Sequence, residues 1–141
     1  MSTTPPFRKG TPSPNQLNYW EKLEDLEAKE IAKGVKRKLS YCENDPRMMI
    51  VCWEIDPPAT FPLHKHEHKQ LGFVLQGKAK FRIGEETKIV EQNTFYRIPP
   101  NVEHGAEILG PEKGIFIDIF SPIRKDFLEE EKPFYFEEKN D

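Results

Sequence analysis

The sequence predicts an all-β fold, a jelly-roll barrel, and three observations support this. From Lys36 onward the chain consists of short runs rich in β-branched and aromatic residues, and Pro, Gly and Asn separate these runs. Several runs alternate apolar and polar residues, as strands with one face in water do. No long amphipathic helix competes with them. This combination favours a jelly roll or small barrel over an α/β architecture.

Eight segments are expected to form the strands of the barrel. Their ranges are 36–41, 47–55, 71–76, 78–83, 87–91, 95–98, 104–109 and 114–120. In 78–83 apolar residues alternate with basic ones, so one face of that strand is expected to lie in water. In 47–55 both faces are apolar, which predicts a strand covered on both sides.

The length of 141 residues fits one domain. Residues 1–18 are rich in Pro, Ser, Thr and Asn, so they are expected to form a flexible N-terminal arm. Residues 19–141 are then expected to form a single domain with its barrel core at about 36–120. The charge-rich segment 20–33 fits a short helix and an irregular edge strand equally well, and the sequence leaves both possibilities open.

Charge and hydropathy exclude several classes of partner. The 21 basic and 24 acidic residues give a formal charge of −3 and are spread along the chain, so no basic stripe predicts nucleic-acid binding. No apolar run approaches the ~20 residues that span a bilayer. The N-terminus has no apolar core of a secretory signal, which predicts a cytoplasmic protein. Cys42 and Cys52 are accordingly expected to be free thiols without a catalytic role.

Histidines point to a metal site. The chain has four, and three of them, His64, His66 and His68, fall within five positions. Residues two apart in an extended segment project to the same side, so His64 and His66 can offer two imidazole nitrogens to one ion. Gln70 lies an even number of residues from both, so in an extended segment its side chain projects to the same side. His104 follows a Pro-rich turn, after which a strand can begin and run back beside the first two histidines. On spacing alone, a solvated loop explains the cluster as well as a metal does.

The complete pattern resembles both motifs of the cupin family. Segment 64–77 reads His-x-His, three residues, Gln, six residues, Gly, with Gln in place of the usual Glu, and segment 99–104 reads Pro-x-Asn-x-x-His, with Asn in place of the usual Gly. The resemblance covers about residues 36–120. It implies the cupin double-stranded β-helix, a jelly-roll barrel. It also implies one divalent metal ion, whether Ni, Fe, Mn or Zn, held by four ligands: His64, His66, Gln70 and His104.

Both departures from the motifs have a physical reading. Asn tolerates a left-handed backbone, so Asn101 can occupy a turn position that otherwise requires Gly. Gln70 can donate a carbonyl oxygen to a metal but brings no negative charge, which leaves the ion a stronger Lewis acid and a better receptor for an anionic ligand. His68 also has the parity of a ligand and can replace Gln70 or act as an acid–base group. We favour the simpler reading, a neighbour outside the ligand set.

The last predicted strand carries a second signal. It places Phe116, Asp118 and Phe120 on one face, and an aspartate among apolar residues is costly to bury unless it has a partner or a task. A Lys or Arg on a neighbouring strand is the ordinary partner. The stretch Asp118-x-Phe-Ser-Pro-x-Arg124-x-Asp-Phe resembles the tail of the KdgF-like cupins of pectin and alginate breakdown, which open 4,5-unsaturated monouronates into linear keto-deoxy acids.

That resemblance implies roles for three residues. Asp118 would move the proton, Arg124 would bind the substrate carboxylate and assist catalysis, and Phe120 would form a wall of the substrate site. The expected function is a metal-dependent, isomerase- or lyase-type enzyme acting on a small anionic, sugar-derived substrate. A metal-dependent dioxygenase and a non-enzymatic cupin that binds a small acid are the alternatives. The cupin resemblance and the apolar segment 47–55 also predict a homodimer.

Overall fold

The computed structural model describes residues 19–129 of the chain, and the predicted N-terminal arm at 1–18 lies outside the described residues. The described part is built almost entirely from strands: β1 Lys29–Ala32, β2 Val35–Tyr41, β3 Met49–Ile55, β4 Thr60–His64, β5 Lys69–Gln76, β6 Lys78–Ile83, β7 Glu86–Glu91, β8 Phe95–Ile98, β9 His104–Leu109 and β10 Gly114–Ser121. A 3-10 turn at Leu23–Asp25 precedes them, and the short helix α1, Lys125–Leu128, follows.

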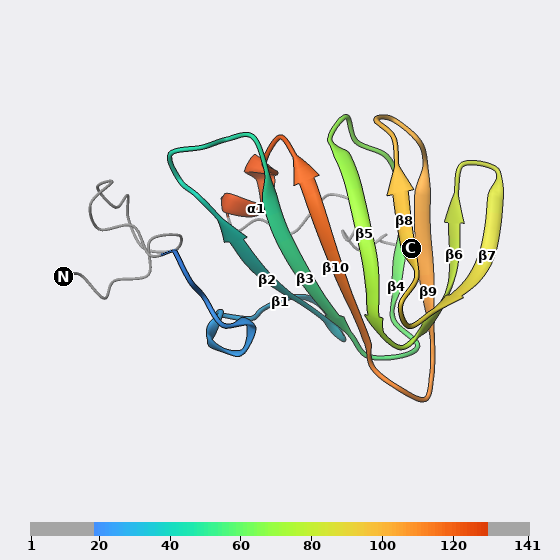
Figure 1. Ribbon diagram of the computed structural model, residues 1–141. Helices are drawn as coiled ribbons and strands as arrows, with labels where there is room; N and C mark the ends of the chain where they lie inside the picture. Colours follow the sequence, from blue (N-terminus) through green and yellow to red (C-terminus); the bar gives the residue numbers. More distant parts are fainter. Residues whose placement is uncertain (1–18, 130–141) are drawn as a thin grey trace.

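The strands form two antiparallel sheets that face each other (Figure 1). One sheet has the order β1-β2-β3-β10-β5-β8, and the other has the order β4-β9-β6-β7. Sequence neighbours such as β3 and β4 lie in different sheets, and β10 pairs with β3 and β5, as expected for a jelly roll. The predicted all-β fold class is therefore confirmed.

All eight predicted strands are present, with ends shifted by no more than about two residues. Two further strands are present, β1 and β4, and of these β4 was not predicted. Segment 20–33, left open between helix and strand, contains the 3-10 turn and then β1. Strand β4 has Pro62 at its centre. Proline is tolerated there because β4 is at the edge of its sheet and pairs only with β9.

The apolar core fills the space between the sheets. Its buried members come from both sheets and include Val51, Val74, Phe81, Ile108 and Phe116. Cys52 is buried and Cys42 is half-buried, and both are free thiols, as predicted. Within residues 19–129, no helix is long and apolar enough to cross a membrane.

The prediction that segment 47–55 is covered on both sides is wrong for part of its outer face. Met49, Val51 and Trp53 point into the core, but Met48 and Ile50 are 56% and 46% exposed. The reason is that β3 belongs to a sheet with one face on the core, and on its other face Cys52 is buried but Met48 and Ile50 are not. The apolar residues Met48 and Ile50 on the outer face therefore belong to the surface of the described part and not to a buried layer.

Candidate metal centre

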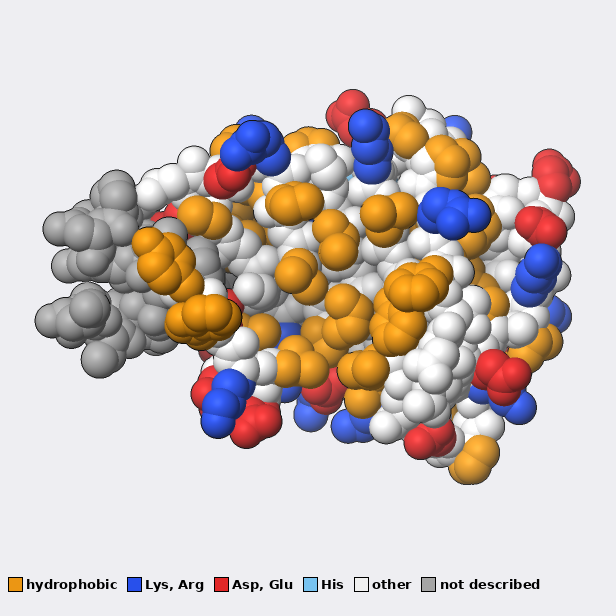
Figure 2. Space-filling view, viewed as in Figure 1, with side chains coloured by type: hydrophobic (Ala, Val, Ile, Leu, Met, Phe, Trp, Pro, Cys, Tyr) orange, Lys and Arg blue, Asp and Glu red, His pale blue; other side chains and the backbone are white. Residues whose placement is uncertain are grey.

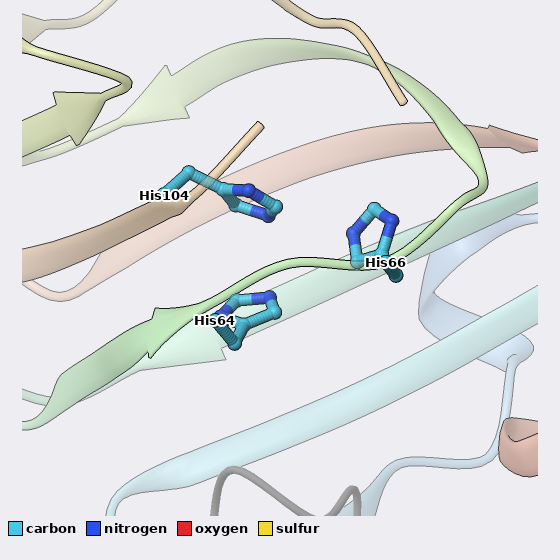
Figure 3. A group of neighbouring side chains, drawn as sticks. All are labelled: His64, His66 and His104. Carbon is cyan, nitrogen blue, oxygen red and sulfur yellow. The ribbon is translucent and has the colours of Figure 1, made fainter. Parts of the chain in front are cut away.

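Three histidines from two distant parts of the sequence converge, as Figure 3 shows. His64 ends β4 and His104 begins β9, and the two are directly paired in the ladder between these strands. Their ring centroids are 4.2 Å apart, and the ring of His66, in the loop after β4, lies 4.9 Å from that of His104. One ring nitrogen from each residue lies within 4.8 Å of the others.

A turn fixes the loop that carries His66. Asn101 has a φ of 64°, in the left-handed region, so the sequence-based reading of Asn in a Gly position is confirmed. Its backbone N–H donates to the carbonyl oxygen of His66 over 2.8 Å. The second motif therefore positions a residue of the first.

Backbone carbonyls define the protonated nitrogen of each ring. Nδ1 of His64 lies 2.8 Å from the carbonyl oxygen of Pro62, Nδ1 of His66 lies 3.1 Å from that of His68, and Nδ1 of His104 lies 2.9 Å from that of Val102. A carbonyl can only accept, so each Nδ1 carries the proton and each Nε2 presents a lone pair. This arrangement is typical of metal-binding histidines, whose second nitrogen donates to a carbonyl.

The Nε2 lone pairs of His66 and His104 meet no hydrogen-bond donor among the described residues. Nε2 of His66 lies 3.1 Å from Oε1 of Gln70, which is also an acceptor. Nε2 of His104 is buried and has no hydrogen-bond partner among the described residues. Acceptors gathered in this way repel each other unless a cation lies among them. The donor set of the chain therefore fits a divalent metal ion.

Electrostatics keep the histidines in the form that binds metal. Burial lowers the pKa of His64 to about 3 and that of His66 to about 4, and it also lowers the pKa of His104. Repulsion between His64 and His104 and the nearby Arg124 charge act in the same direction. The rings are consequently neutral at pH 7, with their ligand nitrogens free of protons.

Asp118 lies in the barrel interior, as predicted from its place on the last strand, and is 3% exposed. Its hydrogen-bond partners are neutral donors and not the Lys or Arg that is the ordinary partner of a buried aspartate. The Tyr96 hydroxyl donates to Oδ1 over 2.7 Å, and the side chains of Gln70 and Trp53 also hydrogen-bond to the carboxyl. Burial raises the pKa of Asp118 to about 6, although these hydrogen bonds lower it. Asp118 is therefore largely ionised at pH 7.

The sequence analysis did not identify Tyr96 and Trp53 as partners of Asp118. The glycine at position 72 could have indicated the contact with Tyr96. Tyr96 and Asp118 are the ladder partners of Gly72 on the two strands that flank β5. A Cβ on Gly72 would lie 2.0 Å from the Tyr96 ring. The missing side chain lets the ring cross β5 and reach Asp118. An isolated glycine inside a strand pattern often marks such a close approach.

Phe120 and Arg124 lie beside the histidines. The Phe120 ring is 5.6 Å from that of His66, and the Arg124 guanidinium lies 5.0 Å from the Phe120 ring. Nε and one terminal nitrogen of Arg124 donate to Asp126 at 3.1 and 2.9 Å. The other terminal nitrogen is buried and has no partner among the described residues. This nitrogen is an unsatisfied buried donor in the described part of the chain.

His68 is not part of the histidine cluster. Among the described residues, the group that can share one ion contains His64, His66 and His104. The contribution of His68 is its backbone carbonyl, which accepts the Nδ1 proton of His66. Its half-buried ring packs 6.4 Å from that of Phe120. This placement supports the interpretation of His68 as a neighbour outside the ligand set.

Comparisons with known proteins agree with the fold and the motifs. Residues 51–120 match the model of the Cupin domain family. The pectin degradation protein KdgF of Dickeya dadantii is 35% identical over 100 residues, which cover 70% of this chain and 88% of the relative. An RmlC-like cupin of Shewanella frigidimarina has 31% identity and a TM-score of 0.71, covering 78% of this chain and 96% of that one. For KdgF of Halomonas sp. the identity is 30% and the TM-score 0.68, over 74% of this chain and 95% of that one. With these relatives, a jelly-roll fold and the two histidine motifs, the chain belongs to the cupin family.

Proposed function

We propose that this cupin is a metal-dependent enzyme that opens 4,5-unsaturated uronates to linear keto-deoxy acids. The observation that carries the proposal is one neutral donor set, three imidazoles and a carboxamide, with an acid–base group and a guanidinium beside it. The similarity to KdgF, a pectin degradation protein, supports the substrate class.

Four side chains would hold the metal: His64, His66, Gln70 and His104. When bound, the divalent ion would supply a Lewis acid for an anionic oxygen of the substrate. All four ligands are neutral, so none of them offsets the charge of the ion. This choice of ligands suits an acidic sugar better than a neutral one.

Arg124 would bind the uronate carboxylate. Two of its nitrogens donate to Asp126, which fixes the plane of the guanidinium, and the third is buried without a partner among the described residues. A guanidinium in a fixed plane recognises a carboxylate by direction as well as by charge. Phe120 lies against this guanidinium and the His66 ring, and it would form the wall that orients the sugar and excludes water.

Asp118 would move the proton. Opening the cyclic hemiacetal breaks the bond between C1 and the ring oxygen and leaves an aldehyde at C1 and an enol at C5. The hemiacetal hydroxyl on C1 loses a proton, and the enol becomes a ketone when C4 gains one. The reaction therefore gains and loses no atoms and is an isomerisation. A buried carboxylate that shares the barrel interior with His64 and Gln70 is suited to carry this proton.

The reaction can be tested directly. The metal-loaded protein is incubated with 4,5-unsaturated galacturonate while the ultraviolet absorbance of the C4=C5 bond and dissolved oxygen are recorded. We expect the absorbance to fall without oxygen uptake, because ring opening consumes none. Oxygen uptake would instead indicate a dioxygenase, and tight binding without a change in absorbance would indicate an acid-binding protein. Either result would overturn the proposed reaction.

The outer face of the six-stranded sheet supports a homodimer. Exposed apolar side chains gather on this face, which Figure 2 shows: Met48, Ile50, Leu71, Leu75 and Phe95. A contiguous apolar sheet face is typical of a surface that pairs with a second copy. Leu71→Asp is expected to convert a dimer into monomers in sedimentation velocity, whereas Thr87→Asp, on exposed β7, leaves the dimer intact. A wild-type monomer at micromolar concentration would contradict the pairing.

A further inference from the structure

Asp118 accepts hydrogen bonds from three side chains. Tyr96, Gln70 and Trp53 all hydrogen-bond to it, and the carboxyl lies fully inside the barrel. An ionised carboxylate only accepts, and its two oxygens provide about four lone-pair positions, so three donors can be satisfied together. Each of these three donors is neutral. The carboxylate is thus an acceptor that orders its neighbours.

The contact with Gln70 has a consequence for the metal centre. A carboxamide has an oxygen end and a nitrogen end of nearly equal size, and only the oxygen can bind a cation. In Gln70, Oε1 lies 3.1 Å from Nε2 of His66. The side chain also hydrogen-bonds to Asp118, which lies two residues from it in the ladder between β5 and β10. Because an ionised carboxylate only accepts, the carboxamide N–H is the donor in that second contact. We propose that Asp118 is a positioning residue that holds the Gln70 carboxamide with its oxygen toward the metal.

Packing holds Asp118 in place for this task. The Tyr96 ring lies over Gly72, so its hydroxyl reaches Oδ1 across β5. The Trp53 indole is wedged between two aromatic rings, with centroids 4.8 Å from Phe61 and 5.7 Å from Phe127, both edge to face. Donors fixed in this way leave the carboxylate little freedom to turn. The orientation of Gln70 is therefore set by rigid strands and not by the loop that carries His66.

The same contact explains why a carboxamide occupies position 70, where cupins usually have Glu. A carboxylate at this position would have no N–H for Asp118, and two buried carboxylates in contact cannot both remain ionised. The neutral side chain of Gln70 and the carboxylate of Asp118 therefore depend on each other. The inference depends on the metal centre proposed above, and it is independent of which substrate the enzyme takes.

The test separates the hydrogen bond from the charge. Co²⁺ affinity is measured by competition with a chelator for Asp118→Asn, which keeps an acceptor oxygen, and for Asp118→Leu, which has none. Both variants lose the same charge. We expect Asp118→Leu to bind Co²⁺ about 10–100-fold more weakly than Asp118→Asn, the usual effect of losing a group that orients a ligand. The visible spectrum of bound Co²⁺ should change in the Leu variant only.

Repeating both substitutions in a Gln70→Ala background shows whether Asp118 acts through Gln70. Without the carboxamide the Leu and Asn variants should bind Co²⁺ equally. An equal affinity of the two variants with Gln70 present, or the same ratio in both backgrounds, overturns the inference. Should Asp118→Leu fail to fold, as judged by its thermal transition without metal, Asp118→Ala gives the same comparison. Uronate turnover enters none of these measurements, so a failure of the proposed reaction is recognised separately.

Discussion

Replacing His104 by Ala is expected to abolish turnover of the unsaturated uronate. His104 begins β9 and meets His64 directly across the ladder, so its loss removes one of three imidazoles from the cluster. Without the ion, the charge stabilisation of a developing oxygen anion is lost, which corresponds to about 4 kcal/mol or roughly 1000-fold in kcat/KM. The measurement is kcat/KM together with metal content by elemental analysis, and both should fall together.

His68→Ala is the matched control for this variant. It removes another imidazole from the same region but keeps the backbone carbonyl that accepts from His66. We expect this variant to retain its metal ion and most of its activity. Unchanged kcat/KM in His104→Ala, or loss of the ion in His68→Ala with retention in His104→Ala, would show that the ligand set is wrong.

The second large effect is expected for Asp118→Asn. This variant keeps the shape of the side chain and an oxygen that can accept from Gln70, but it cannot carry the proton that C4 gains. General acid–base catalysis contributes about 10²- to 10⁴-fold, so kcat should fall by that factor. Metal content should stay at the level of the unmodified protein. Steady-state kinetics on metal-saturated enzyme, followed through the C4=C5 absorbance, measure the loss.

Tyr96→Phe is the control that separates proton transfer from packing. It removes one hydrogen bond to Asp118 but leaves the carboxyl and the ring over Gly72 in place. Its kcat should fall far less than that of Asp118→Asn. Wild-type kcat in Asp118→Asn would remove Asp118 from the mechanism, while the metal centre and its ligands would stand.

The first-motif ligands could be predicted from sequence because their information is local. The alternation of side chains in an extended segment places His64 and His66 on one side, and the structure brings their rings together. Asn101 was also readable, since few residues other than Gly adopt the left-handed backbone that it has here. His104 required the motif as a whole, because no spacing rule connects position 104 to position 64.

The partners of Asp118 could not be read from the sequence, since they depend on register. Tyr96 and Asp118 lie on opposite sides of β5, and only the pairing of three strands at Gly72 brings them together. A shift by one residue would have turned Tyr96 outward. Strand β4, which was not predicted, contains Pro62. A proline is tolerated there because β4 lies at a sheet edge, which is a property of the assembled fold.

The location of the ion tests the central claim most directly. Crystals of the protein grown with Co²⁺ would be measured on both sides of the cobalt absorption edge, and the anomalous difference map would show where the ion lies. We predict a single strong peak enclosed by Nε2 of His64, His66 and His104 and by Oε1 of Gln70. A map with no peak among these atoms, with the His104 ring turned toward solvent, would contradict the metal centre and the chemistry built on it.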